Sequence, residues 1–333
     1  MSCSRKLFFK RLVLDALRPS RVVQRQKFIV RHVLDKAFSS SSSSGTKEKK
    51  SDDHNHVRLN ISSTLLLNDN VPIPRFGLGV YDIDPKQTKQ AVLWALESGY
   101  RQIDTAARYN NEKCVGQAIK ESKLNREELF VVTKVYHVDH GYDETLRAFD
   151  KSLNFLGLDF VDLYLIHFPV PGSVVQTWKA MIKLKEIGLI RSIGVSNFNI
   201  HHLEALSQES SVIPSVNQIE VHPYLQERRL VDYCKEKGIA VQVYSPLTRG
   251  KKLNDPVLKG IAKECNRSPA QVLLRWCIQK GFICIPKSFH YDRIKENIEI
   301  FEFKIEQPHM NMLDGLDEGF RTGRDKILSP WDG

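Results

Sequence analysis

The sequence has no pair of cysteines at CxxC spacing, and its six cysteines follow no regular interval. This pattern suits a reducing compartment, and we interpret the cysteines as buried small side chains rather than as bridges or metal ligands. The 333 residues are 41% hydrophobic and 26% charged, close to the average for globular proteins. A small disulfide scaffold and wholesale disorder are therefore both excluded.

The chain beyond residue 50 has no net charge. Residues 1–50 contain 13 lysines and arginines against 3 acidic residues, which accounts for the whole formal charge of +10. Binding to nucleic-acid phosphates requires a broad positive surface, so the basic composition does not indicate a nucleic-acid partner.

The basic N-terminal segment lacks an apolar run long enough for a secretory signal or a membrane span, because Lys10 and Arg11 interrupt the only candidate. Residues 1–38 alternate basic and apolar side chains and lead into the serine tract Ser39 to Ser44. This composition predicts a mitochondrial transit peptide. The alternative is a solvated basic tail, in which case we expect a cytoplasmic protein.

Three regions follow from composition. Residues 39–56 contain almost no apolar side chains and predict a flexible linker between the leader, 1–38, and a folded domain, 57–333. At the start of the domain, Ser62 to Leu67 and Val71 to Pro74 flank Asn-Asp-Asn. Asn and Asp tolerate the positive φ of tight turns, so this stretch predicts an N-terminal β-hairpin.

Short apolar runs then alternate with helical patterns. We predict strands over Arg75 to Val80, Tyr100 to Ala106, Leu129 to Val135, Phe160 to Phe168, Ile190 to Asn197, Ser215 to Val221, Ile239 to Leu247 and Phe282 to Ser288. Helices are expected between them, for example over Pro85 to Ser98, Asp143 to Leu156, Gln226 to Lys237 and Pro269 to Gln279. Eight such units in an α/β chain favour a (β/α)8 TIM barrel.

An open dinucleotide-binding sheet is disfavoured because its phosphate motif is incomplete. Gly77-Leu78-Gly79 begins a GxGxxG pattern, but Asp82 stands where the third glycine belongs. A metal hydrolase is also disfavoured, since the first strand lacks an HxH pair, and we expect no metal site.

In a TIM barrel the reacting groups lie at the C-terminal ends of the strands. Those ends carry Asp104, Lys134, His167, Ser196, Asn197, Tyr244, Ser245 and Lys287, and Tyr109 follows Asp104 by five residues. A free tyrosine has a pKa of about 10, and a lysine cation about 4 Å away lowers it. Lys134 is therefore expected to activate Tyr109 as a proton donor, with Asp104 holding the lysine charged and His167 bonding a substrate oxygen.

Each of these residues alone has a structural explanation. Asp104 and Lys134 make a plausible ion pair, His167 a core histidine, and Tyr109 a loop tyrosine. Their convergence at three adjacent strand ends favours chemistry on a carbonyl oxygen.

Several motifs of the domain occur together and in order. They are Gly99-Tyr100-Arg101-Gln102-Ile103-Asp104-Thr105-Ala106 leading to Tyr109, Glu112 and Gly116; Thr133-Lys134-Val135; Leu165-Ile166-His167-Phe168-Pro169; Gly194-Val195-Ser196-Asn197-Phe198; and Ile285-Pro286-Lys287-Ser288 with Arg293, Glu296 and Asn297. From Val57 onward the chain resembles the aldo-keto reductases, in particular short-loop members such as reductases of diketogluconate or methylglyoxal and prostaglandin F synthase-like enzymes. Gln102 departs from the residues usual in the first motif, and we expect no functional consequence.

The resemblance implies an NADPH-dependent reductase with the catalytic tetrad Asp104, Tyr109, Lys134 and His167, and Tyr109 as the proton donor. It implies that the nicotinamide amide is held by Ser196, Asn197 and Gln218 and that the ring stacks on Tyr244. The adenosine 2′-phosphate falls to Lys287, Ser288 and Arg293, and Ser245, Leu247, Glu296 and Asn297 complete the cofactor site. A lysine and an arginine flanking a hydroxyl group suit a phosphate.

The connections after the fourth and seventh strands are short, so we expect an open mouth and small carbonyl substrates such as aldehydes, dicarbonyls or keto sugars. His167 at the fourth tetrad position favours carbonyl over enone reduction within the family. We expect a monomer with neither a nucleic-acid nor a membrane partner. Two alternatives stay open: a non-catalytic NADPH-binding regulatory or structural barrel, and a Schiff-base aldolase with Lys134 as nucleophile.

Overall fold

The computed structural model describes residues 59–170 and 173–323. The described residues belong to one compact unit, Arg58–Gly333, which contains every element described below. The predicted leader and linker lie outside the described residues.

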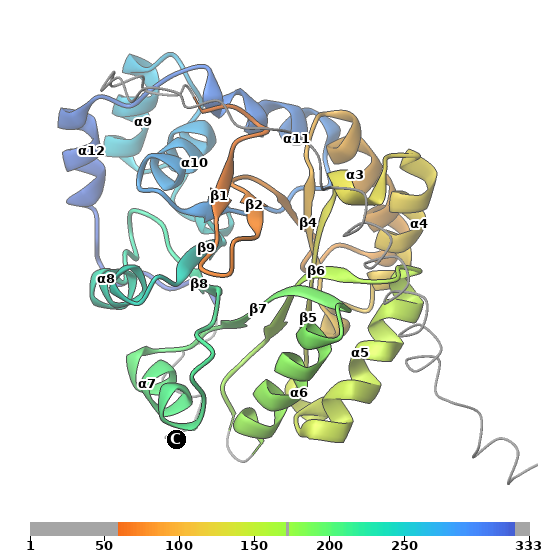
Figure 1. Ribbon diagram of the computed structural model, residues 1–333. Helices are drawn as coiled ribbons and strands as arrows, with labels where there is room; N and C mark the ends of the chain where they lie inside the picture. Colours follow the sequence, from red (N-terminus) through yellow and green to blue (C-terminus); the bar gives the residue numbers. More distant parts are fainter. Residues whose placement is uncertain (1–58, 171–172, 324–333) are drawn as a thin grey trace, which may run out of the picture. The chain divides into compact units, whose positions relative to one another are not determined.

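Eight parallel strands form one sheet in the order in which they occur along the chain (Figure 1). They are β3 (Leu78–Gly79), β4 (Gln102–Asp104), β5 (Phe130–Val135), β6 (Val161–Ile166), β7 (Ile190–Ser196), β8 (Val216–Glu220), β9 (Ala240–Tyr244) and β10 (Ile283–Cys284). Isolated parallel bridges between Phe76 and Cys284 and between Gly79 and Lys287 join the first strand to the last. The sheet is therefore closed, and the predicted barrel is confirmed.

Helices follow the strands and surround the sheet in Figure 1. They are α3 (Pro85–Glu97), α4 (Glu112–Ser122), α5 (Tyr142–Leu156), α6 (Val174–Glu186), α7 (Ile200–Glu209), α8 (Arg228–Glu236), α9 (Pro256–Glu264), α10 (Pro269–Gln279), α11 (Tyr291–Ile298) and α12 (Gln307–Asp314), with short 3₁₀ turns η1 (Ala107–Tyr109), η2 (Arg126–Glu128), η3 (His137–Asp139), η4 (Thr248–Gly250) and η5 (Glu299–Phe301). The predicted helices are confirmed to within two residues at each end.

Local sequence explains where several helices begin. Asp84 precedes Pro85, and its carboxylate accepts a hydrogen bond from the backbone N–H of Lys86. Ser268 precedes Pro269 and exchanges hydrogen bonds with Gln271 in a capping box. An acidic or hydroxyl cap followed by proline satisfies backbone donors that have no partner within the helix.

The strands at the seam of the barrel are shorter than predicted. Regular pairing covers only two residues each in β3 and β10. A Cβ at Gly79 would lie 3.0 Å from the carbonyl oxygen of Ile285 across the seam, and Pro286 has no N–H to donate. Close backbone approach and a missing donor reduce the seam to isolated bridges.

The predicted hairpin is confirmed. Strands β1 (Thr64–Leu66) and β2 (Pro72–Pro74) pair antiparallel, and Asn70 in the turn has a φ of 64°. Buried side chains of this region, Leu67 and Ile73, pack in one core cluster with barrel residues such as Phe130 and Leu163. The hairpin therefore covers one end of the barrel interior.

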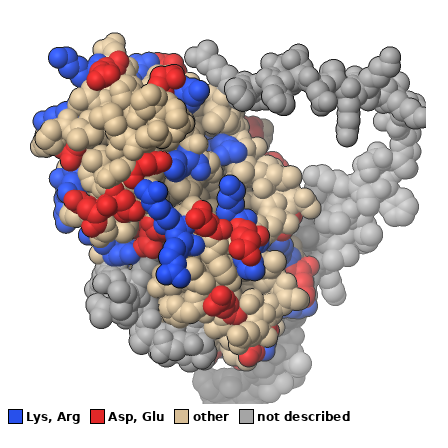
Figure 2. Space-filling model, turned by 90° about the vertical axis from the view of Figure 1, so that its left-hand side faces the viewer, with Lys and Arg blue, Asp and Glu red and all other residues tan. Residues whose placement is uncertain are grey.

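Acidic and basic side chains are interspersed on the face shown in Figure 2. Ion pairs between side chains at the surface include Lys280 with Asp314 and Arg228 with Asp317. Within the described residues, no helix is both long enough and apolar enough to cross a membrane.

Candidate active site

The four predicted tetrad residues meet at the C-terminal ends of neighbouring strands. Asp104 ends β4, Lys134 lies in β5, His167 follows β6, and Tyr109 ends the turn η1 after β4. Asp104, Tyr109 and His167 line a cavity of about 1000 Å³. Lys134 is fully buried behind them and does not line the cavity.

Lys134 connects the group through its ammonium. Its Nζ lies 2.6 Å from Oδ1 of Asp104, 2.9 Å from the carbonyl oxygen of Thr105 and 3.4 Å from Oη of Tyr109. The other carboxylate oxygen of Asp104 accepts a hydrogen bond of 2.7 Å from the amide of Gln218. The carbonyl of Thr105 thus orients the lysine, and the amide of Gln218 orients the carboxylate.

The prediction that the pKa of Tyr109 is lowered is wrong for the protein without bound cofactor. Burial raises the pKa of Tyr109 well above its usual value, and the negative charge of Asp104 adds to the rise. Burial likewise lowers the pKa of the Lys134 ammonium, against the opposing influence of Asp104, and raises the pKa of Asp104. The Asp104 carboxylate, 2.6 Å from the Lys134 ammonium, opposes the influence of that ammonium on the tyrosine.

His167 presents a neutral imidazole to the cavity. Burial, together with the nearby cation of Lys134, keeps its pKa well below the usual value. Its ring lies edge-on to that of Tyr109, with the ring centres 5.6 Å apart, and stacks on Phe168. A neutral imidazole at this position is available for a hydrogen bond without carrying charge.

The cavity extends from the tetrad to the predicted cofactor residues. Its lining includes Ser196, Gln218, Tyr244, Ser245, Leu247, Lys287, Ser288, Arg293, Glu296 and Asn297. Asn197 is the exception, since its buried amide bonds the carbonyl oxygen of His167 at 3.0 Å and the hydroxyl of Tyr244 at 2.8 Å. Asn197 therefore fixes two lining residues and does not face the cavity.

The part of the cavity that is lined by Arg249, Lys287 and Arg293 fits a phosphate. Arg249, Lys287 and Arg293 are exposed in its lining, and none of the three forms an ion pair with any residue that the structure describes. Burial and the Arg249 charge lower the pKa of Lys287. Unpaired cations beside the Ser288 hydroxyl provide the charge and donors that a phosphate dianion requires.

Several lining residues were missed from the sequence: Tyr81, Asp82, Arg108, Arg249, Thr322 and Gly323. Arg108 adjoins Tyr109, which was a usable signal. Thr322 and Gly323 had no such signal, because they reach the cavity only through tertiary contacts. Their backbone N–H groups donate to the Glu220 carboxylate at 2.8 and 2.9 Å, as does the Thr322 hydroxyl.

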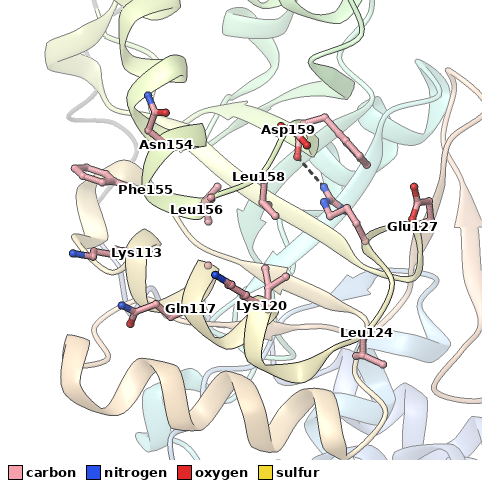
Figure 3. A pocket seen from close by; sticks show the side chains of 15 residues that line it. Lys113, Gln117, Lys120, Leu124, Glu127, Asn154, Phe155, Leu156, Leu158 and Asp159 are labelled. Atoms are coloured by element: carbon pink, nitrogen blue, oxygen red, sulfur yellow. Dashed lines mark hydrogen bonds between the residues drawn. The ribbon is translucent and has the colours of Figure 1, made fainter. Parts of the chain in front are cut away.

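A second hollow, of about 760 Å³, lies between α4 and the end of α5 (Figure 3). Lys113, Lys120 and Phe155 line it, together with Leu158. Its lining contains none of the predicted site residues.

Comparison with known proteins identifies the family of the chain. Residues 75–318 match the Aldo/keto reductase family. The chain is 47% identical over 264 residues to glyoxal reductase of Bacillus subtilis, covering 79% of this chain and 96% of that protein. It is 48% identical over 263 residues to 9,11-endoperoxide prostaglandin H2 reductase of Trypanosoma cruzi, covering 78% and 93%.

Solved structures agree in the same way. An aldo/keto reductase from Brucella melitensis superposes with a TM-score of 0.75 at 48% identity, covering 77% of this chain and all of that one. An aldo-keto reductase of Bombyx mori in complex with NADP superposes with a TM-score of 0.76 at 37% identity, covering 81% and 97%. The chain belongs to the aldo/keto reductase family.

Proposed function

We propose that this protein reduces small aldehydes and ketones to alcohols with NADPH. The observation that carries the proposal is the single cavity that joins Tyr109 and His167 at one end to unpaired cations at the other. A reactive carbonyl and a phosphate-bearing cofactor can be held together there. The NADP complex of the Bombyx mori relative supports the choice of cofactor.

The tetrad supplies the proton. Tyr109 Oη donates its proton to the carbonyl oxygen, and the neutral His167 imidazole bonds the same oxygen and orients it. The Lys134 ammonium, 3.4 Å from Oη, stabilises the phenolate that forms, and Asp104 positions the lysine. NADPH, when bound, supplies the hydride to the carbonyl carbon.

The cofactor roles follow the family pattern. Ser196 and Gln218 face the nicotinamide end, and Asn197 acts from behind by fixing Tyr244, whose ring forms the stacking surface. Lys287, Ser288 and Arg293 bind the 2′-phosphate, which favours NADPH over NADH. Ser245, Leu247, Glu296 and Asn297 complete the lining.

The substrate is small. The connection between β6 and α6 occupies only residues 167–173, and η4 lies within the short connection after β9, so little chain covers the mouth. The Bacillus subtilis relative is named a glyoxal reductase, which fits an open site for small dicarbonyls. Small polar carbonyls are therefore the preferred class.

A Schiff-base aldolase is disfavoured by burial. Lys134 is fully buried and does not line the cavity, so a substrate carbonyl has no path to its nitrogen. A non-catalytic NADPH-binding barrel is the remaining alternative. It predicts cofactor binding without turnover.

The test follows absorbance at 340 nm during NADPH oxidation by the full chain, with methylglyoxal, phenanthrenequinone and an aromatic aldehyde as substrates. Tyr109→Phe is expected to lower kcat by about 10²- to 10⁴-fold, as loss of a general acid does, and to leave NADPH binding by fluorescence quenching nearly unchanged. Tyr142→Phe, at an exposed position on α5, is the control. Full activity in Tyr109→Phe contradicts the proton-donor role, whereas NADPH binding without any turnover supports the non-catalytic barrel.

A further inference from the structure

Arg108 is a cation at the substrate end of the cavity without an acidic partner. It lies in η1 directly before Tyr109, is half-buried and lines the cavity. Its guanidinium carbon lies 5.3 Å from the centre of the Tyr136 ring. Among the described residues it forms neither an ion pair nor a hydrogen bond.

The acidic residues of the cavity are engaged elsewhere. Asp104 is paired with Lys134, and the Glu296 carboxylate accepts a hydrogen bond from the Ser268 hydroxyl. Asp82 acts electrostatically on Lys287, at the cofactor end. No carboxylate of the lining is left to neutralise Arg108.

The cation is close to the reacting groups. Tyr136 lies between Arg108 and His167. The Arg108 guanidinium lies over the Tyr136 ring, and the centres of the Tyr136 and His167 rings are 6.3 Å apart. Arg108 therefore lies one side chain from His167. The Lys134 ammonium and the Arg108 guanidinium both lower the pKa of His167, so two cations lie near this imidazole.

An unpaired, half-buried guanidinium beside an oxygen-binding site matches an anionic substrate group. Arginine binds carboxylates through two parallel N–H bonds, and such charge-assisted bonds are stronger than neutral ones. Packing on the Tyr136 ring restricts the arginine side chain and lowers the conformational entropy lost when an anion binds.

We propose that Arg108 binds the carboxylate of the substrate, and that the preferred substrates are short oxo acids, in which a carboxylate stands a few bonds from the reduced carbonyl. This inference deepens the proposed function and rests on it. Arg108 is a specificity-determining residue in this scheme, since it holds the substrate anion while the tetrad acts on the carbonyl.

The test compares succinic semialdehyde with its uncharged methyl ester. For the full-length wild-type enzyme with NADPH, we expect kcat/KM to favour the acid. Arg108→Gln is expected to lower the acid-to-ester ratio of kcat/KM by about 10- to 100-fold, mainly through KM, because a hydrogen bond to a charged group is lost. Arg108→Lys keeps the charge and is expected to restore part of the ratio.

The matched control is Arg147→Gln. Arg147 lies on the exposed surface of α5, where it pairs with Glu144. Its substitution changes the net charge of the protein by the same amount, so a fall in the ratio that appears in both variants would contradict a local role for Arg108. The ratio is expected to stay at the wild-type value.

A binding measurement separates this inference from the proposed function. Calorimetric titration of the NADP-loaded protein with pentanoate and pentanamide is expected to show that Arg108→Gln weakens pentanoate binding about tenfold with a much smaller effect on the amide. The inference is overturned if Arg108→Gln weakens pentanoate and pentanamide binding equally, or if its acid-to-ester ratio of kcat/KM stays within twofold of wild type. Either result is compatible with the proposed reductase activity. Arg108-dependent pentanoate binding without turnover of either aldehyde supports the anion site and contradicts the reductase.

Discussion

Gln102 lies fully buried in β4, and neither polar atom of its side-chain amide has a partner in the structure. A buried amide that forms no hydrogen bond loses its hydration without compensation. Gly77 packs so closely against the Gln102 side chain that a larger residue in place of Gly77 would not fit. The departure from the usual motif at this position therefore affects stability rather than chemistry.

Gln102→Met is expected to raise the free energy of unfolding by about 1–2 kcal/mol, because it keeps the side-chain shape and removes the unpaired polar atoms. Urea denaturation measures the change. Gln87→Met, at an exposed site on α3, serves as control and is expected to change stability by less than about 0.5 kcal/mol. A less stable Gln102→Met protein would show that the amide has a stabilising partner.

For single residues, the sequence predicted correctly where the tetrad side chains lie but not the direction in which the pKa of Tyr109 is shifted. Strand ends identified Asp104, Lys134 and His167 because the barrel rule places functional groups there. The pKa of Tyr109 was predicted in the wrong direction, since it depends on burial and on a 2.6 Å distance between Asp104 and Lys134 that spacing along the chain does not reveal.

Among the elements, the hairpin is attached to the barrel by a carboxylate in its turn, in addition to the core packing of Leu67 and Ile73. Asp69, in the turn between β1 and β2, accepts hydrogen bonds from Lys185 at 2.5 Å, Ser215 at 2.9 Å and Ser192 at 3.1 Å. Burial alone would raise the pKa of Asp69, but these bonds outweigh it and the pKa is lowered. The turn is thereby held to helix α6, to strand β7 and to the residue before β8.

Asp69→Ala is expected to lower the free energy of unfolding by about 2 kcal/mol, because the three donors lose a charged acceptor. Asp232→Ala, on the exposed side of α8, tests whether loss of any acidic residue has the same effect. Equal unfolding curves for the two variants would show that the Asp69 contacts contribute nothing.

Several contacts attach the C-terminal segment, residues 315–323, to the barrel, and one of them is to a buried acid. Glu220, at the end of β8, accepts the hydrogen bonds from Thr322 and Gly323 and another contact from His222. Burial favours the protonated form, but these hydrogen bonds prevail and hold the pKa of Glu220 at about 2, below the usual 4.5. A lowered carboxyl pKa stabilises the fold above pH 4.5, and this contribution is lost as the pH falls toward 2.

Glu220→Gln is expected to lower the free energy of unfolding by about 2 kcal/mol at neutral pH. The difference from wild type is expected to shrink at about pH 3, where the wild-type carboxylate begins to take up protons. Urea denaturation at both values measures it. A difference that stays constant with pH would show that the carboxylate charge is not what holds the segment.

Pattern reasoning predicted the elements more accurately than their ends. Hydrophobic runs located all eight strands, and caps such as Asp84-Pro85 located helix starts. The seam strands were predicted too long, because the pairing there depends on close backbone approach at Gly79 rather than on side-chain pattern. The C-terminal contacts with Glu220 join segments distant in sequence, and no local pattern marks them.

For the whole molecule, the N-terminal leader stays a prediction. Its basic, serine-rich composition motivates the proposal that residues 1–38 direct the protein to mitochondria. The full chain is expected to enter isolated mitochondria and become protease-protected, whereas a chain lacking residues 1–38 is expected to remain outside. Uncleaved cytosolic protein in cells, with or without the segment, would contradict the proposal.

The seam of the barrel also has a consequence for the order in which the protein folds. The bridges that close the sheet join Phe76 and Gly79, near the start of the domain, to Cys284 and Lys287, near its end. Contacts between residues so far apart carry a large loop-closure entropy and form slowly. The first strand therefore emerges from the ribosome long before its partner is synthesised, and one of its edges stays unpaired during that time. Binding of a chaperone to the nascent chain in this period would protect it from aggregation.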